Sequence, residues 1–326
     1  MTLTLRRRSL LAGSLATPLI ARHGWTQAAY PNKTIRMVVP FAPAGTTDLL
    51  GRVAAAYLTE AWGQQVVVDN KSGAGGNVGA EIVAKAAPDG YTMLIANQAM
   101  LVSPFLFAQM GYDPLKDLLP VTMINSAPLM VVVHPALPVK SFAELLAYSK
   151  ANPGKLNYGS GGIGSTPFLA VESLKSVTGL DATHVPYKGG APALADLVAG
   201  QLAFMVENVP GTLPLVKDGK LRALAVTSAK RVALVPDLPT LQEAGIAGYE
   251  MIGWNGLFVP AGTPRDIVAK LHDASAKVLR RPDVIEQLAK LGAESVGNPQ
   301  PEFAAFVQAE TDRWGRIIRD KGIKPE

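Results

Sequence analysis

Two junctions of similar design constrain the fold of this chain more than any other feature of its sequence. Each joins a short strand-like run to an amphipathic helix through a turn rich in Gly, Ser and Thr; they read PFAPAGTTDLLGR (40–52) and YGSGGIGSTPFLAVE (158–172). The start of a helix leaves backbone N–H groups without partners and carries a partial positive charge. Each junction is therefore a seat for an anion, and the pair predicts one small anion held between two lobes.

Strand-like and helix-like segments alternate along the whole chain. The first series predicts strands at 34–40, 65–69 and 92–96 with a largely buried helix at 47–62. The second series predicts strands at 155–159, 183–186, 202–206 and 222–227, with helices at 167–177 and 192–199, a short helix near Leu213 and an earlier helix from Ser141. This alternation predicts an α/β fold in which each lobe is a mainly parallel sheet flanked by helices.

The last part of the chain is expected to return to the first lobe. After a strand at 256–260, three helices begin near Pro264, Asp283 and Pro301, the first with Thr263 and Asp266 as its predicted capping pair. These helices have no strands of their own. We therefore predict a discontinuous first lobe, 30–126 and 255–326, a second lobe, 127–254, and a two-strand hinge near 124–128 and 253–255.

Residues 1–28 are typical of an export signal peptide. Arg6, Arg7 and Arg8 precede a weakly apolar run at 10–20, and a small-residue cleavage site ends near Ala28. The run is shorter than the ~18 apolar residues that span a bilayer. The Arg-Arg pair favours the twin-arginine route over the general route, and we expect a periplasmic protein.

Composition excludes several classes of function. Most of the net charge of +5 belongs to the signal segment, so the remainder gives no argument for nucleic acid as a partner. The chain has no cysteine, and its histidines lack the spacing of metal ligands, so we expect no metal and no disulfide. No nucleophile motif is visible. We expect no catalysis, no cofactor and a monomer.

Two glycine patterns resemble nucleotide-binding motifs but lack their partners. Gly159, Gly161 and Gly164 match GxGxxG, yet the nearest acidic residue, Asp181, precedes the next strand instead of ending it. The loop at 72–79 lacks the lysine of a phosphate-binding loop. We interpret that loop as allowing tight backbone packing beside the cleft.

Three polar features are candidates for the cleft, each with a plainer alternative. Asp48 either pairs with Arg52 across one helical turn or braces the first loop from behind. Glu207 and Asn208 are either a solvated strand end or the partner of an ammonium, hydroxyl or protonated group at the far end of a ligand. Tyr187, which follows a strand, is a candidate lid contact.

The chain resembles the Bug-type (TctC) solute-binding proteins of the tripartite tricarboxylate transporter group. The resemblance runs through both junctions and through VVVDNKSGAGGNVGAEIVAKAAPDGYTML, HVPYKGGAPALADLVAGQ, GKLRALAVTSAKR, LPTLQEAG and GLFVPAGTP. It implies a type II-like periplasmic-binding-protein fold whose lobes close on a small carboxylate. It also implies delivery of that ligand to a membrane permease of the tripartite tricarboxylate type.

In that family the first-lobe loop, here Ala44–Thr47, and the second-lobe helix start, here Ser160–Thr166, hold the carboxylate through N–H groups, hydroxyls and waters. Three residues depart from the family pattern: Ala44 replaces a glycine, Phe168 a common histidine and Glu207 a usual aspartate. With Asp48 as the brace, the predicted ligand-binding set is Phe41, Ala44, Gly45, Thr46, Thr47, Asn97, Ser160, Gly161, Gly164, Ser165, Thr166, Tyr187, Glu207 and Asn208.

The leading hypothesis is a periplasmic solute-binding protein for a small mono- or dicarboxylate, including amino or aromatic acids. The first alternative is the binding component of a membrane sensor, which needs the same lobe closure. The second is a secreted hydrolase of small esters, which the missing nucleophile motif disfavours.

Overall fold

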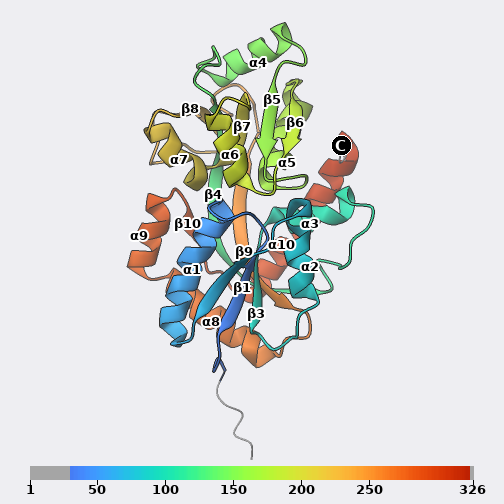
Figure 1. Ribbon diagram of the computed structural model, residues 1–326, viewed down its shortest axis with the longest axis vertical. Coiled ribbons are helices and arrows are strands. Elements are labelled where there is room, and N and C mark those ends of the chain that lie inside the picture. Colours follow the sequence, from blue (N-terminus) through green and yellow to red (C-terminus); the bar gives the residue numbers. More distant parts are fainter. Residues whose placement is uncertain (1–29, 324–326) are drawn as a thin grey trace, which may run out of the picture. The chain divides into compact units, whose positions relative to one another are not determined.

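Two long strands, β4 (Leu118–Val133) and β9 (Ile252–Pro260), carry the chain between two sheets. They pair antiparallel from Leu118 opposite Pro260 to Pro128 opposite Ile252. The computed structural model describes residues 30–323, and the predicted export signal lies outside them. In Figure 1, β4 and β9 connect the blue and orange elements of a first lobe with the green and yellow elements of a second.

The first lobe is built on a mixed sheet. Its parallel strands are β2 (Val66–Asn70), β1 (Ile35–Val39) and β3 (Thr92–Ala96), and β9 joins β3 antiparallel. The short β10 (Glu294–Ser295) pairs with β4. Its helices are α1 (Thr46–Trp62), the 3₁₀ turn η1 (Ala74–Gly76), α2 (Asn77–Ala84), α3 (Gln98–Leu106), α8 (Arg265–Leu279), α9 (Pro282–Lys290) and α10 (Gln300–Lys321).

The second lobe repeats this plan on a smaller sheet. The strand β5 (Asn157–Ser160) runs parallel to β6 (Thr183–Pro186) and to β7 (Phe204–Asn208), and β4 pairs antiparallel with β7 and with β8 (Arg222–Val226). Its helices are α4 (Phe142–Ala151), α5 (Thr166–Thr178), α6 (Gly190–Val198) and α7 (Val209–Lys217). The predicted α/β arrangement of two sheets joined by two strands is confirmed.

The connection between the lobes contains a buried polar pair. Asn255 Nδ2 of β9 donates to Asn125 Oδ1 of β4 at 2.9 Å, and both side chains are buried. The strand register shifts between Met123 and Asn125. This pair lies in or beside the predicted hinge crossings; the domain boundaries proposed from the sequence stay a prediction.

One helix and one helix cap differ from the sequence prediction. The helix α3 was not predicted; it starts at an Asn97 cap and contains Pro104. The predicted Thr263 cap is wrong, because its hydroxyl donates to the Pro260 carbonyl at 2.7 Å and Pro264 occupies the cap position. The helix α10 packs on both lobes, since Trp314 joins the core cluster of the second lobe.

A buried histidine lies in the core of the second lobe. His184 of β6 places Nε2 2.7 Å from Ser160 Oγ, and its ring packs against Tyr158 and Phe168 with centroids 4.9 and 4.8 Å away. Burial lowers the pKa of His184 from its usual value of 6.5 to about 4. The folded protein therefore holds this imidazole neutral at pH 5 to 6, where an unfolded chain binds a proton.

This pKa difference predicts a specific loss of stability in acid. As pH falls from 6.5 towards 4, the unfolded state gains a proton that the folded state does not, which lowers the free energy of unfolding by about 3 kcal/mol at pH 4. The variant His184→Gln should lose this part of the pH slope. Urea unfolding of both proteins between pH 4.5 and 7.5 measures it, and identical slopes would contradict the assignment.

Candidate functional site

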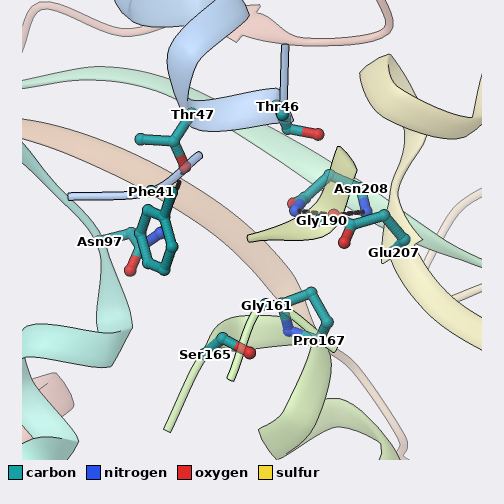
Figure 2. A pocket seen from close by; sticks show the side chains of 11 residues that line it. Phe41, Thr46, Thr47, Asn97, Gly161, Ser165, Pro167, Gly190, Glu207 and Asn208 are labelled. Atoms are coloured by element: carbon teal, nitrogen blue, oxygen red, sulfur yellow. Dashed lines mark hydrogen bonds between the residues drawn. The ribbon is translucent and has the colours of Figure 1, made fainter. Parts of the chain in front are cut away.

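A small cavity between the two lobes receives residues from both predicted junctions. Figure 2 shows its wall, with Thr46 and Thr47 of α1 opposite Ser165 and Pro167 of the second lobe. The cavity volume is about 30 Å³, which corresponds to about two water positions. The wall consists of Phe41, Gly45, Thr46, Thr47, Asn97, Gly161, Ser165, Pro167, Gly190, Glu207 and Asn208.

Five helices of the described chain begin at this cavity. The capping residues of α1, α3, α5 and α7 and the first residue of α6 all line it; they are Gly45, Asn97, Ser165, Asn208 and Gly190. Each helix start adds a partial positive charge and free N–H groups. The cavity therefore attracts an anion although no Lys or Arg side chain lies in its wall.

One side of the cavity carries neutral hydrogen-bonding groups. Asn97 Nδ2 lies 3.4 Å from Thr47 Oγ1, while Asn97 Oδ1 accepts the N–H of Ala99 at 3.0 Å. Ser165 Oγ accepts the N–H of Phe168 at 3.4 Å, which caps α5 and leaves the hydroxyl proton free to donate. These groups suit a carboxylate, whose oxygens accept several hydrogen bonds at once.

Thr46 contributes a buried hydroxyl that lacks a partner. It is 8% exposed, and within residues 30–323 its Oγ1 makes no hydrogen bond. A Cβ atom added at Gly211 of α7 would lie 2.8 Å from this oxygen, so the hydroxyl sits where the two lobes approach. A buried polar group without a partner costs about 1–3 kcal/mol, and a bound ligand would remove that cost.

Glu207 brings a carboxyl group into the same wall. It ends β7 together with Asn208 and is 3% exposed. Its Oε1 accepts the backbone N–H and the side-chain amide of Asn208, both at 2.8 Å. Burial raises the pKa of Glu207 above its usual range, against the effect of these two hydrogen bonds.

Asp48 lies behind the first-lobe loop and is absent from the cavity wall. It accepts hydrogen bonds at 2.9 Å from the backbone N–H of Ala44, from Asn70 Nδ2 and from Arg52 Nε. Burial acts to raise the pKa of Asp48, but these donors outweigh it and hold the pKa below the usual range. The structure thus contains both arrangements considered for Asp48, the pair with Arg52 and the contact that holds the loop.

Five predicted residues lie outside the cavity wall. The Tyr187 hydroxyl donates to Asp196 Oδ2 at 2.5 Å, and its role as a lid contact stays a prediction. Ser160 is fully buried, and its Oγ lies 2.7 Å from His184 Nε2 and accepts the N–H of Gly162. The residues outside the wall are Ala44, Ser160, Gly164, Thr166 and Tyr187.

Ala44 keeps the backbone conformation that its glycine counterpart would favour. Its φ is 64°, in the left-handed region that side chains rarely adopt. The Ala44 N–H donates to Asp48 Oδ2 at 2.9 Å, so this hydrogen bond accompanies the left-handed conformation. Phe168, the second departure, packs in the second-lobe core and not in the cavity wall.

Two wall residues were missed by sequence analysis, Pro167 and Gly190. Pro167 lies in the first turn of α5, where proline is common, so it carried no signal of its own. Gly190 leaves space for a neighbour: a Cβ atom there would lie 2.6 Å from Glu207 Oε2. Its role depends on a contact between β7 and α6 that the sequence does not reveal.

Backbone contacts join the lobes at the mouth of the cavity. The N–H of Ala42 in the first lobe donates to the carbonyl of Lys188 in the second at 3.0 Å. In the loop 72–79, Gly75 meets the second-lobe turn at Ile163, where an added Cβ atom would overlap the Ile163 carbonyl oxygen. The glycine loop therefore packs tightly across the cleft and is absent from the cavity wall.

Gly75→Ala should consequently disturb the approach of the lobes. Gly63→Ala is a matched control, because Gly63 has φ 62° against 63° for Gly75 and an added Cβ meets nothing within 4 Å. Both changes carry the left-handed strain of about 1 kcal/mol. Only Gly75→Ala should add either a further loss in urea unfolding or a larger radius of gyration in X-ray scattering. Equal behaviour of the two variants in both measurements would contradict the contact.

Metal-binding clusters and membrane-spanning helices are both absent from residues 30–323. No group of His, Asp or Glu side chains there could hold a metal ion. Within the same range, no helix is both long and apolar enough to cross a membrane.

Comparison with known proteins places the chain among periplasmic binding proteins. The family model described as tripartite tricarboxylate transporter family receptor matches residues 50–323. BugT of Bordetella pertussis is 36% identical over 297 residues, 90% of this chain and 91% of BugT. The predicted resemblance is thereby confirmed.

Solved structures agree with that comparison. The R. palustris protein Rpa4515, solved with adipate, superposes with a TM-score of 0.87 at 40% identity over 90% of this chain and 98% of that protein. MatC from Rhodopseudomonas palustris, solved with bound malate, has a TM-score of 0.83 at 35% identity over 89% of this chain and 100% of MatC. The predicted periplasmic-binding-protein fold is confirmed.

Proposed function

The chain belongs to the tripartite tricarboxylate transporter receptor family, whose members are periplasmic solute-binding proteins, and we propose that it captures a small carboxylate between its lobes. It then delivers this carboxylate to a membrane permease of that transporter type. The main support for this proposal is the structure of the cavity wall. Five helix starts surround a cavity in which the buried Thr46 hydroxyl has no partner among the described residues. That arrangement suits an anionic oxygen ligand.

The proposed contacts follow from the donors in the wall. Thr47, Asn97 and Ser165 offer hydroxyl and amide groups, and the helix starts add backbone N–H groups. A carboxylate accepts up to about four hydrogen bonds, so it can satisfy several of these donors at once. Bonds to a charged acceptor are the stronger kind, which supports binding without an arginine.

Two of the similar structures support the ligand class. Rpa4515 was solved with adipate and MatC with malate, and both ligands are dicarboxylates. This chain shares the fold and about the same length with both proteins. The likeness supports a carboxylate as the class of ligand for this chain as well.

Capture requires the lobes to part. The cavity volume of about 30 Å³ is far below the roughly 300 Å³ at which typical ligand pockets begin. A ligand larger than a few atoms therefore enters an open form, with motion at β4 and β9 as the proposed hinge. Such hinge motions take microseconds to milliseconds.

We propose a periplasmic location for the mature chain after export by residues 1–28. A periplasmic binding-protein family supports that location. The signal segment itself lies outside the described residues.

The carboxylate proposal predicts selective thermal stabilisation. A ligand that binds only the folded state should add about 2.7 kcal/mol at a hundredfold excess over its dissociation constant. We expect the melting temperature to rise with small carboxylic acids and to stay unchanged with the corresponding neutral amides. Differential scanning fluorimetry of the exported protein measures this. A screen in which no acid raises the melting temperature would overturn the proposal.

The proposed contacts predict losses at two positions on opposite lobes. Thr47→Val and Ser165→Ala should each weaken binding of a stabilising acid by about 1–3 kcal/mol, because each leaves a buried carboxylate oxygen without a donor. Ser176→Ala is the control, since Ser176 lies exposed on the same helix as Ser165. Isothermal titration calorimetry gives the affinities. Wild-type affinity in both wall variants would remove this site.

A further inference from the structure

Among the described residues 30–323, Glu207 is the one ionisable side chain in the cavity wall. It is 3% exposed, so water screens it poorly. No Lys, Arg or His side chain lines the cavity, and within the described chain Glu207 forms no ion pair. A buried carboxylate without a cation is energetically costly unless a partner arrives from outside the protein.

The two oxygens of Glu207 have different surroundings. Oε1 accepts both hydrogen bonds from Asn208, at 2.8 Å each, and these bonds fix the orientation of the carboxyl group. Oε2 makes no hydrogen bond to residues 30–323 and lies beside Gly190, where an added Cβ atom would approach to 2.6 Å. One oxygen is thus held in place, and the other is available to a ligand.

The cavity consequently has two ends of different chemistry. In Figure 2, Glu207 and Asn208 lie on one side of the cavity, while Thr47 and Asn97 lie on the other and Ser165 lies below. The neutral donors suit a carboxylate. The Glu207 end suits the opposite kind of group, a hydrogen-bond donor that carries positive charge.

We propose that Glu207 makes this site selective for small acids that also carry a protonated amine, so that the ligand is an amino acid or a related zwitterion. The inference rests on the proposed carboxylate site and adds a requirement at its far end. The ligand carboxylate binds at the helix starts, and its ammonium group donates to Glu207 Oε2. Burial raises the pKa of Glu207, and no cationic side chain in the cavity wall stabilises its charge.

Charge balance distinguishes this ligand from a simple acid. A zwitterion supplies an anion to the helix starts and a cation to Glu207. An acid without an amine leaves Glu207 unpaired, and a second carboxylate near Glu207 would be repelled by it. The preference should therefore follow the amine and not the number of carboxylates.

Matched ligand pairs test the inference on the wild-type protein. 4-Aminobutyrate is compared with butyrate, and aspartate with succinate, by isothermal titration calorimetry at pH 7. A hydrogen bond between charged groups predicts that at least one amine-bearing acid binds about tenfold or more tightly than its partner. Plain acids that bind as tightly as their amine-bearing partners would overturn the inference while leaving the carboxylate proposal intact. Binding of none of the four would count against both.

Variants identify the side chain responsible. Glu207→Gln keeps the size of the side chain but removes its charge, and it should reduce the preference for the amine by about tenfold or more. Asp237→Asn removes one negative charge from the exposed surface of the second lobe and should keep the wild-type preference. A preference that survives in Glu207→Gln would overturn the assignment. Because the ligand pairs already test wild-type protein, a poorly folded variant does not decide the outcome.

Discussion

The whole site depends on one constraint: parallel strands end at the same edge of their sheet, and the helix that follows each strand starts there. In the first lobe β1 and β3 lead into α1 and α3, and in the second β5, β6 and β7 lead into α5, α6 and α7. Ligands of open α/β sheets bind at this carboxyl edge. The two edges face each other across β4 and β9, so helix starts from both lobes meet at a cavity whose wall contains no Lys or Arg side chain.

Two buried acids respond to this setting in opposite ways. Asp48 lies behind the loop and receives three donors, so its pKa falls despite burial. Glu207 lies in the cavity wall with donors on one oxygen only, and burial raises its pKa. Glu207 is the more deeply buried of the two and has no cationic donor, whereas Asp48 receives one of its hydrogen bonds from the charged Arg52. The first acid is fully compensated within the described chain and positions the loop, whereas the second depends on what enters the cavity.

The sequence predicted both anion seats because glycine, serine and threonine mark a strand-to-helix junction directly. It missed α3, since its apolar residues show no helical periodicity and Pro104 argues against a helix. It also missed Gly190 at the start of α6, which lies against Glu207 of β7. The left-handed φ of Ala44 was not evident from the sequence either, because side chains rarely adopt that region. The close approach of Gly190 to Glu207 joins two different elements, and periodicity within one segment does not encode such a contact.

Closure and selectivity are linked by the same few contacts. The approach of Gly75 to Ile163 and the hydrogen bond from Ala42 to Lys188 set how near the lobes come. At the separation of the lobes in this structure, the Thr46 hydroxyl lies beside Gly211 and shares a small cavity with Glu207. A ligand can favour the closed form only by binding it better than the open form. A compound that contacts the helix starts of one lobe and makes no contact with the other therefore binds without favouring closure. A compound that forms hydrogen bonds with groups on both lobes stabilises the closed form itself.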